Sequence, residues 1–126
     1  MMRRVTLLLL SSAVVSVGAA AEAESVVIER GRAVFATCAA CHRDASAEVP
    51  NPGPDLRGVF GRAAGTVPGF RYSRAMRKAN RTWNEDTLDV FLQDPQAALP
   101  GNAMPFPGLP EDGKRRDLIA FLKSYQ

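Results

Sequence analysis

The chain has 126 residues, of which 46% are hydrophobic, and its formal net charge is +3, from 16 Lys and Arg against 13 Asp and Glu. This length fits one domain and excludes an enzyme built from two lobes, while the moderate charge and hydrophobicity exclude a disordered chain and a multi-span membrane protein. Two cysteines exclude a multi-disulfide scaffold, and a single histidine sharply limits metal and acid–base chemistry.

Residues 1–23 have the features of a secretory signal peptide. Arg3 and Arg4 supply the positive start, and a short apolar run covers residues 5–17. That run has about 13 residues, whereas a membrane-spanning helix needs roughly 20. We therefore interpret the segment as a cleaved signal and not as a membrane anchor.

Small residues between Gly18 and Ala23 match the pattern that a signal peptidase accepts. Cleavage after Ala21 and cleavage after Ala23 satisfy this pattern equally, so both positions stay open. The predicted mature domain covers residues 24–126, and its predicted location is the periplasm. Because two of the arginines leave with the signal, the mature chain offers little support for nucleic-acid binding.

Hydrophobic spacing predicts a helix at each end of the mature domain. The first helix has one apolar face with helical spacing, formed by Val27, Gly31, Val34, Phe35 and Cys38. Near the C-terminus, the same kind of spacing relates Leu118, Phe121, Leu122 and Tyr125. Glu111 and Asp112 follow Pro110 in the first turn of this second helix, where acidic residues complement the helix dipole.

Two shorter helices are predicted between these two. One has an apolar face made of Leu88, Phe91 and Leu92. Thr82 and Glu85 have the spacing of a capping box at its start, and Pro95 is expected to end it. The other is expected to run over residues 73–80.

Glycine- and proline-rich segments over 44–69 and 95–110 separate these helices. No stretch alternates apolar and polar residues as a strand does, so the predicted fold class is all-α, with three to five short helices and long loops. Such loops leave a poor core in a chain of this length unless something else fills its centre. A large apolar cofactor would fill it.

The strongest motif is Cys38-Ala39-Ala40-Cys41-His42, a C-x-x-C-H sequence that is the signature of covalent haem attachment. Two thiols at this spacing add across the two vinyl groups of a haem, and the adjacent histidine then reaches the iron from one face. The predicted helix that ends at Cys38 delivers the first thiol.

Three other readings of the motif are weaker. A structural zinc site needs four ligands, and the chain offers two cysteines and one histidine. A thioredoxin-like redox pair is expected between a strand and a helix, a context that is missing here. A plain disulfide between Cys38 and Cys41 would leave His42 incidental.

Several motifs in the same order resemble class I cytochrome c, particularly the mitochondrial proteins and their short-chain bacterial relatives. After C-A-A-C-H come G-P-D-L at 53–56, G-V-F-G-R at 58–62, P-G-F-R-Y at 68–72, T-W at 82–83, L-P-G-N-A-M at 99–104 and L-I-A-F-L at 118–122. The resemblance covers essentially all of residues 24–126. It implies the class I cytochrome c fold, wrapped around one haem c.

The resemblance implies that Cys38 and Cys41 hold the haem covalently and that His42 and Met104 are the axial ligands of its iron. Met76 is the other methionine of the mature chain, but it lies between two arginines in a predicted helix. Met104 lies in a loop braced by proline and glycine, which suits a rigidly held ligand. Ligation by His and Met favours ferrous iron and raises the reduction potential.

Supporting roles follow from the same resemblance. The carbonyl of Pro54 is expected to accept the free ring N–H of His42. The residues expected to contact a haem propionate are Arg62, Tyr72 and Trp83, and Asn102 is expected to contribute there or to support the ligand. Gly31 and Phe121 are expected at a close crossing of the terminal helices.

The chain departs from the family at two positions on the methionine side of the haem. Phe91 stands where mitochondrial members carry a Tyr, and Met76 where they often carry an Asn. A drier pocket raises the potential, whereas loss of a hydrogen bond to the methionine sulfur lowers it. These effects oppose each other, so the sign of the net change is left open.

The expected docking surface also differs. An uncharged rim is expected to surround the exposed haem edge, formed by Thr37, Ala39, Ala40, Ala97, Ala98, Ala103, Pro105 and Phe106. A basic segment, expected to lie away from this rim, contains Arg71, Arg74, Arg77, Lys78 and Arg81. It is either a solvated face or a second docking patch. We predict docking that is mainly apolar and depends weakly on salt.

The function implied is that of a soluble, exported, monomeric electron carrier with one haem and no catalytic site, because both axial positions are filled. The expected partners are redox proteins: a quinol-oxidising complex, a terminal oxidase, a reaction centre or a dehydrogenase. No nucleic acid or stable membrane insertion is expected. The alternatives are a dedicated electron-accepting subunit of one periplasmic dehydrogenase and a haem-based binder or sensor of small ligands.

Overall fold

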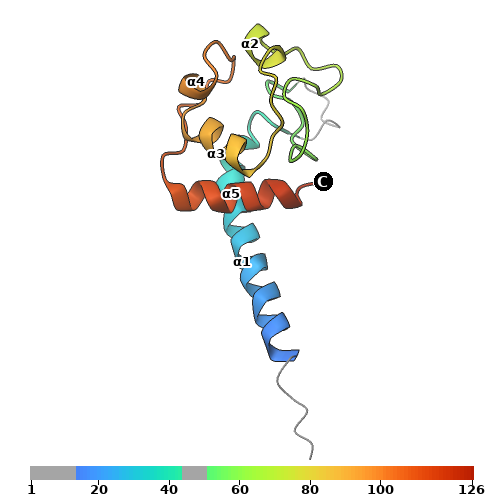
Figure 1. The fold of residues 1–126 in the computed structure, drawn as a ribbon, viewed down its shortest axis with the longest axis vertical. Coiled ribbons are helices and arrows are strands. Elements are labelled where there is room, and N and C mark those ends of the chain that lie inside the picture. Colours follow the sequence, from blue (N-terminus) through green and yellow to red (C-terminus); the bar gives the residue numbers. More distant parts are fainter. Residues whose placement is uncertain (1–13, 44–50) are drawn as a thin grey trace, which may run out of the picture.

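The computed structural model describes residues 14–43 and 51–126, and the regular secondary structure within them is helical. Its helices are α1 (Val14–Cys38), α2 (Arg74–Arg77), α3 (Glu85–Gln93), α4 (Pro95–Ala98) and α5 (Asp112–Ser124) (Figure 1). Among the described residues, the only β-type pairing is an isolated bridge between Ala63 and Thr82. The all-α prediction is therefore confirmed.

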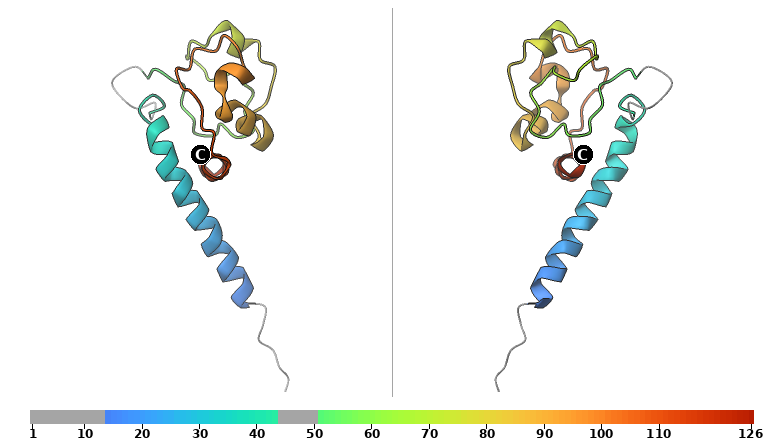
Figure 2. Two further views of the ribbon diagram at one scale, coloured as in Figure 1. Left: turned by 90° about the vertical axis from the view of Figure 1, so that its left-hand side faces the viewer. Right: turned by 90° about the vertical axis from the view of Figure 1, so that its right-hand side faces the viewer.

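The crossing of α1 and α5 organises the lower half of the domain (Figures 1 and 2). A Cβ atom at Gly31 would lie 2.0 Å from the carbonyl oxygen of Asp117 and 2.7 Å from the Cβ of Phe121, so only glycine allows this approach. The rings of Phe35 and Phe121 pack beside it with centroids 4.9 Å apart. The predicted close crossing at Gly31 and Phe121 is confirmed.

Helix α1 is longer than its periodicity predicts, because it begins at Val14 and not near Val27. Its N-terminal half projects away from the rest of the molecule (Figure 2). This half is rich in alanine, the residue with the highest helix propensity. Of the described helices, none is both long and apolar enough to cross a membrane. Arg3 and Arg4, which begin the predicted signal, lie outside the described residues.

Helix α3 has the predicted apolar face, with Leu88, Phe91 and Leu92 all buried. Its predicted capping box is wrong, because the N-cap is Asn84 and not Thr82. The Asn84 side chain accepts a hydrogen bond from the backbone of Thr87, whose hydroxyl accepts one in return from the backbone of Asn84. Thr82 is held in the bridge to Ala63, and this extended backbone moves the helix start along the chain.

Two short helices also differ from prediction. Helix α2 covers only part of the predicted range 73–80: Ser73 caps its start, Lys78 ends it, and Asn80 adopts a positive φ of 47°. Helix α4 lies within a segment predicted to be a loop. Pro95, expected to stop the preceding helix, does so and also begins α4, whose start is capped by the side chain of Asp94.

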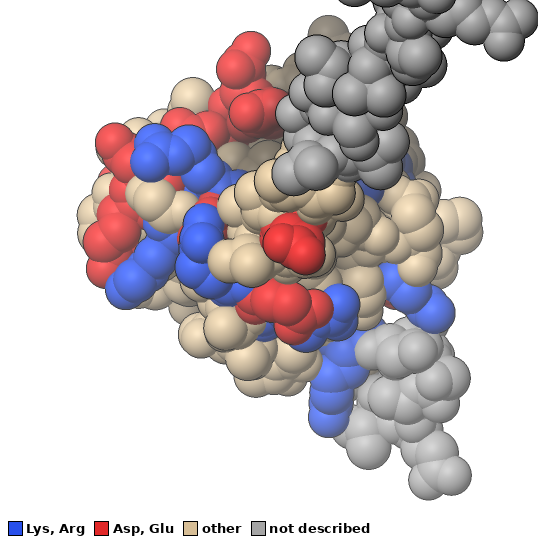
Figure 3. Space-filling model, turned by 90° about the horizontal axis from the view of Figure 1, so that it is seen from below, with Lys and Arg blue, Asp and Glu red and all other residues tan. Residues whose placement is uncertain are grey.

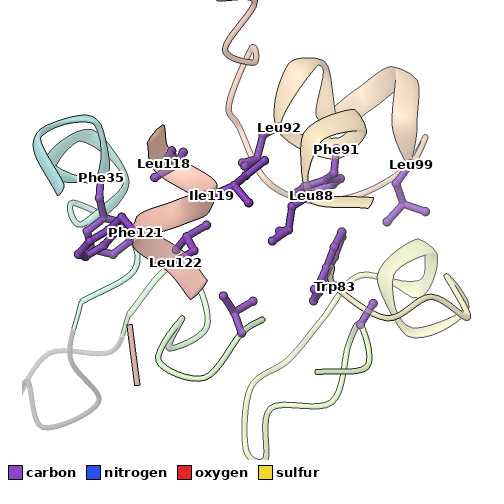
Figure 4. Close-up of a cluster of buried hydrophobic side chains, with 12 residues drawn as sticks. Phe35, Trp83, Leu88, Phe91, Leu92, Leu99, Leu118, Ile119, Phe121 and Leu122 are labelled. Atoms are coloured by element: carbon purple, nitrogen blue, oxygen red, sulfur yellow. The ribbon is translucent and has the colours of Figure 1, made fainter. Parts of the chain in front are cut away.

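The core lies between α5, α3 and the end of α1 (Figure 4). Leu118, Ile119 and Leu122 of α5 belong to this core, and Ile119 projects toward Leu88 and Leu92 of α3. Trp83 packs against Phe91, with ring centroids 5.0 Å apart. Long irregular segments complete the domain and are tied to helices by backbone hydrogen bonds. One of them joins Leu109 N to Leu92 O at 2.8 Å.

Charged residues of both signs are interspersed on the lower face of the molecule (Figure 3). Arg115 is 3% exposed, and its guanidinium binds Asp89 at 2.8 Å and Asp112 at 2.5 Å. The basic segment carries no ion pair to any described carboxylate. It was expected to lie away from the uncharged rim, but Arg81 donates a hydrogen bond to the Ala98 carbonyl, so one end reaches that rim.

Candidate functional site

The C-x-x-C-H motif forms a tight turn directly after α1. Ala39 N still bonds to Phe35 O at 2.9 Å, and the backbone N–H groups of Cys41 and His42 then both turn back to the carbonyl of Cys38, at 3.1 and 2.9 Å. Cys38 is half-buried and Cys41 is exposed, and both are free thiols. In this structure the two cysteines do not form the disulfide of the alternative interpretation.

His42 is held by the segment that begins at residue 51. Its Nδ1 lies 2.7 Å from the carbonyl oxygen of Pro54, which is the hydrogen bond that the resemblance implies. Burial lowers the pKa of His42, and the Pro54 contact opposes this shift only in part. The ring is therefore neutral near pH 7. Since Nδ1–H donates to a carbonyl, Nε2 keeps its lone pair for a metal.

Gly53 is a site residue that sequence reasoning did not single out. It is buried, and a Cβ at this position would lie 2.6 Å from Cε1 and 2.7 Å from Nδ1 of His42. Its own N–H bonds to the Cys41 carbonyl at 2.9 Å. The backbone at Gly53 thus lies flat against the imidazole ring. The only sequence signal for this role is the glycine that opens the G-P-D-L motif.

Met104 is half-buried and packs against the core from the loop that follows α4. Its backbone N–H donates to Oδ1 of Asn102 at 2.9 Å. Asn102 is itself 7% exposed, and its amide nitrogen donates to the carbonyls of Pro95 and Leu99 at 2.8 and 2.9 Å. All three contacts lie within the segment around Met104, and they use both N–H groups of the Asn102 amide.

The three residues expected at a propionate are Tyr72, Trp83 and Arg62, and they differ in how many side-chain hydrogen-bond donors remain unused. Tyr72 accepts the N–H of Val67 at 3.1 Å, so its own hydroxyl hydrogen remains available. The indole N–H of Trp83 makes no hydrogen bond to the described residues. Every fully shielded side-chain N or O in that part of the chain has a partner, so this N–H is accessible from outside the packed core.

Arg62, unlike Tyr72 and Trp83, already donates side-chain hydrogen bonds within the described residues. Its guanidinium donates to the carbonyls of Asp55 at 2.9 Å and Arg57 at 3.3 Å. These bonds brace the chain next to Pro54, whose carbonyl holds His42. A guanidinium has five N–H groups, so further donors remain.

The two departures from the family lie in apolar surroundings. Phe91 is 6% exposed, and Met76 is half-buried against the same core cluster. A groove of about 530 Å³ between α3 and α5 lies elsewhere and has the ionic pairs of Arg115 in its lining. None of the predicted site residues lines this groove, which is a joint between helices.

The residues present fit a covalently bound haem. Two free thiols, a neutral imidazole and a thioether are the groups that such a haem requires, and apolar side chains and unused donors stand beside them. Within residues 14–43 and 51–126, no group of three or more His, Cys, Asp or Glu could hold a metal ion. The zinc reading therefore has no structural support.

Comparison with known proteins gives consistent results. The family model "Cytochrome c" matches residues 28–126. A cytochrome c from Chlamydomonas reinhardtii is 45% identical over 104 residues, which cover 82% of this chain and 93% of that protein. A cytochrome c2 from Rhodomicrobium vannielii is 44% identical and covers 74% of each. The solved structure of cytochrome cH from Methylobacterium extorquens has a TM-score of 0.70 and 39% identity, covering 77% of this chain and 97% of that one.

Proposed function

The chain belongs to the cytochrome c family, and from this premise we propose that it is a soluble periplasmic protein that passes one electron at a time between redox partners, with His42 and Met104 as the iron ligands. As a class I cytochrome c it is a single-haem electron carrier with one covalently attached haem c.

The 2.7 Å hydrogen bond between His42 Nδ1 and the Pro54 carbonyl carries the proposal. It fixes the tautomer that leaves Nε2 as the ligand, and Gly53 lets the backbone press against the ring. Cys38 and Cys41 form the two thioether bonds that keep the cofactor at this histidine. Met104, in the loop that follows α4, would complete the ligand pair.

The haem supplies a one-electron change at its iron. With His42 and Met104 both bound to the iron, the chain would present no open position to a substrate, and buried apolar side chains such as Phe91 would line the site. The sole histidine is committed to the iron, which leaves no acid–base catalyst of the usual kind. We therefore assign no enzymatic activity to the chain. Fitting partners are a quinol-oxidising complex, a terminal oxidase, a reaction centre or a dehydrogenase.

The proposed location rests on the sequence of residues 1–23, with its positive start, short apolar run and small residues before the mature domain. Protein purified from the periplasm is expected to begin at Glu22 or Glu24. An intact N-terminus, or recovery only with membranes, would contradict export and cleavage.

The ligand assignment is tested by Met104→Ala, with Met76→Leu as the control. Loss of the sulfur ligand is expected to abolish the sulfur-to-iron charge-transfer band of the oxidised protein. The reduction potential is expected to fall by roughly 0.1 V or more, because a harder ligand favours ferric iron. Met76→Leu is expected to keep the band.

Two outcomes of this experiment would overturn the assignment. One is a band that survives in Met104→Ala or disappears in Met76→Leu. The other is tight carbon monoxide binding by the unaltered reduced protein, which would mean that the methionine position is open. That second result would favour a binder of small ligands over an electron carrier.

A further inference from the structure

We infer that Asn102 is the positioning residue for Met104, and that its side chain closes the ligand loop on itself without taking part in propionate binding. This inference rests on the proposed ligation by Met104 and adds the device that holds that ligand. The ligand loop is the segment from Pro95 to Pro110, which includes α4.

The hydrogen bonds of Asn102 use every donor that its side chain has. An amide side chain has two N–H donors, and here the amide nitrogen faces two carbonyls, those of Pro95 at 2.8 Å and Leu99 at 2.9 Å. Its oxygen accepts the N–H of Met104 at 2.9 Å. Because no N–H remains, Asn102 has nothing to donate to a carboxylate, and its burial at 7% exposure keeps the arrangement closed to water.

These contacts join both ends of the turn that carries the ligand. Pro95 is the first residue of α4 and Leu99 its C-cap, so the two carbonyls belong to the rigid start of the loop. The Met104 N–H belongs to the ligand itself. Asn102 thereby links the ligand backbone to a helix, and the sulfur position follows from that link.

The rest of the loop offers few replacements for this link. Gln96 and Asn102 are the only two polar side chains between Pro95 and Pro110. Gln96 is exposed and donates longer bonds, at 3.1 Å to the Asn102 carbonyl, 3.2 Å to Asn102 Oδ1 and 3.4 Å to the Met104 carbonyl. Four further prolines within and at the end of the segment have no N–H to offer. Without the Asn102 side chain, the carbonyls of Pro95 and Leu99 keep one backbone donor each, at 3.0 and 3.2 Å, whereas the Met104 N–H loses its acceptor.

Without the Asn102 side chain, the loop is expected to open more often. A ligand from solution competes with Met104 only in the open state, so its apparent affinity rises with the fraction of open loop. Loss of the buried hydrogen bonds in Asn102→Ala is expected to tighten the apparent binding of imidazole to the oxidised protein about tenfold. Asn102→Ser, which keeps one donor and one acceptor in a shorter side chain, is expected to lie between Ala and the unaltered protein.

The experiment titrates the oxidised holoprotein with imidazole and follows the sulfur-to-iron charge-transfer band. The matched control is Asn84→Ala, which removes the N-cap of α3, where Oδ1 accepts Thr87 N at 2.9 Å, and touches no part of the loop. This control is expected to lower stability and to leave the imidazole affinity unchanged. If Asn102 served only the overall stability, Asn102→Ala and Asn84→Ala would have the same effect on imidazole affinity.

The possible results separate this inference from the proposed ligation. If Met104→Ala keeps the charge-transfer band, the ligand assignment itself is wrong. If Met104→Ala loses the band but Asn102→Ala and Asn102→Ser bind imidazole as the unaltered protein does, the positioning role is overturned. A changed pH dependence of the potential without a change in imidazole affinity would also overturn it, because that pattern belongs to propionate contact. Should Asn102→Ala fail to fold, Asn102→Ser decides.

Discussion

His42 and Met104, the two proposed ligands, are held by different kinds of structure. His42 follows α1, the helix that packs against α5. Its ring contacts the backbone at Gly53 and bonds to the carbonyl of Pro54. Met104 lies in a loop that a backbone bond from Leu109 N ties to α3, and its own N–H is bonded by one buried side chain, that of Asn102. The histidine ring is held by backbone groups, whereas the backbone of the methionine is held by a side chain.

Because of this difference, we expect variants on the two sides to change different properties of the protein. A change on the histidine side disturbs backbone packing that the whole domain shares, so it is expected to appear as a loss of unfolding free energy. A change at Asn102 affects one loop, so it is expected to appear first as easier displacement of Met104. The predictions below test this division, beginning with the largest expected effect.

Gly53→Ala is expected to lower the unfolding free energy by about 1–3 kcal/mol, since its Cβ would lie 2.6 Å from Cε1 of His42, a ring that the Pro54 carbonyl holds in place. Denaturant unfolding of the oxidised protein measures this change. The imidazole affinity of the variant is expected to change less than that of Asn102→Ala.

Gly113→Ala is the matched control, because a Cβ there meets nothing within 4 Å and the residue lies in the first turns of α5. It is expected to leave stability unchanged or to raise it by up to about 1 kcal/mol through helix propensity. A Gly53→Ala protein as stable as this control would show that the histidine side is not built from tight backbone packing.

The division also explains what could be predicted from the sequence. C-x-x-C-H is a contiguous motif whose chemistry follows from its spacing, and the apolar faces of α3 and α5 follow from helical periodicity. The 2.7 Å contact of His42 with Pro54 was available only through the resemblance, because twelve positions separate the two residues and no periodicity relates them.

The features that sequence reasoning missed are those decided by tertiary contacts. Thr82 and Glu85 satisfy a capping-box pattern, but the bridge to Ala63 holds Thr82 extended, and Asn84 becomes the cap. Helix α4 has four residues, too few for a periodic signal. Gly53 has no side chain to signal its role. The donors of Asn102 could be assigned only once both of its carbonyl partners were placed.

Asp117→Asn tests the histidine side through the terminal helices. Asp117 on α5 binds Arg30 on α1 at 2.7 and 3.0 Å, and this hydrogen-bonded partner lowers the pKa of Asp117. The variant is expected to lose a small part of the unfolding free energy at pH 7, well under half the effect of Gly53→Ala, since the pair is partly exposed. Imidazole affinity is expected to stay unchanged.

The pH dependence of this effect has a defined sign. A carboxyl whose pKa is lower in the folded protein stabilises fully above its unfolded value, about 4, and this contribution is lost as pH falls through the folded pKa. The difference between Asp117→Asn and the unaltered protein should therefore shrink on acidification below about pH 4. Glu29→Gln, which alters an exposed pair with Arg32 inside α1, is the control and is expected to show no difference at any pH. A gap that persists in acid would mean that Asp117 acts through packing.

The smallest expected effect concerns the surface of the methionine side. The uncharged rim includes Ala97, Ala103 and Pro105, all of which are exposed. A redox partner that approaches this rim therefore contacts few charged side chains. Oxidation of the reduced protein by ferricyanide, an anion, is expected to slow less than about twofold in Arg74→Gln/Lys78→Gln and to depend weakly on ionic strength. Arg32→Gln/Lys123→Gln has the same net charge and serves as the control. A steep salt dependence that is lost only in the first variant would place the electron exit beside the basic segment, to which Arg81 already connects the rim at Ala98. In that case the methionine side would be controlled by charge as well as by Asn102.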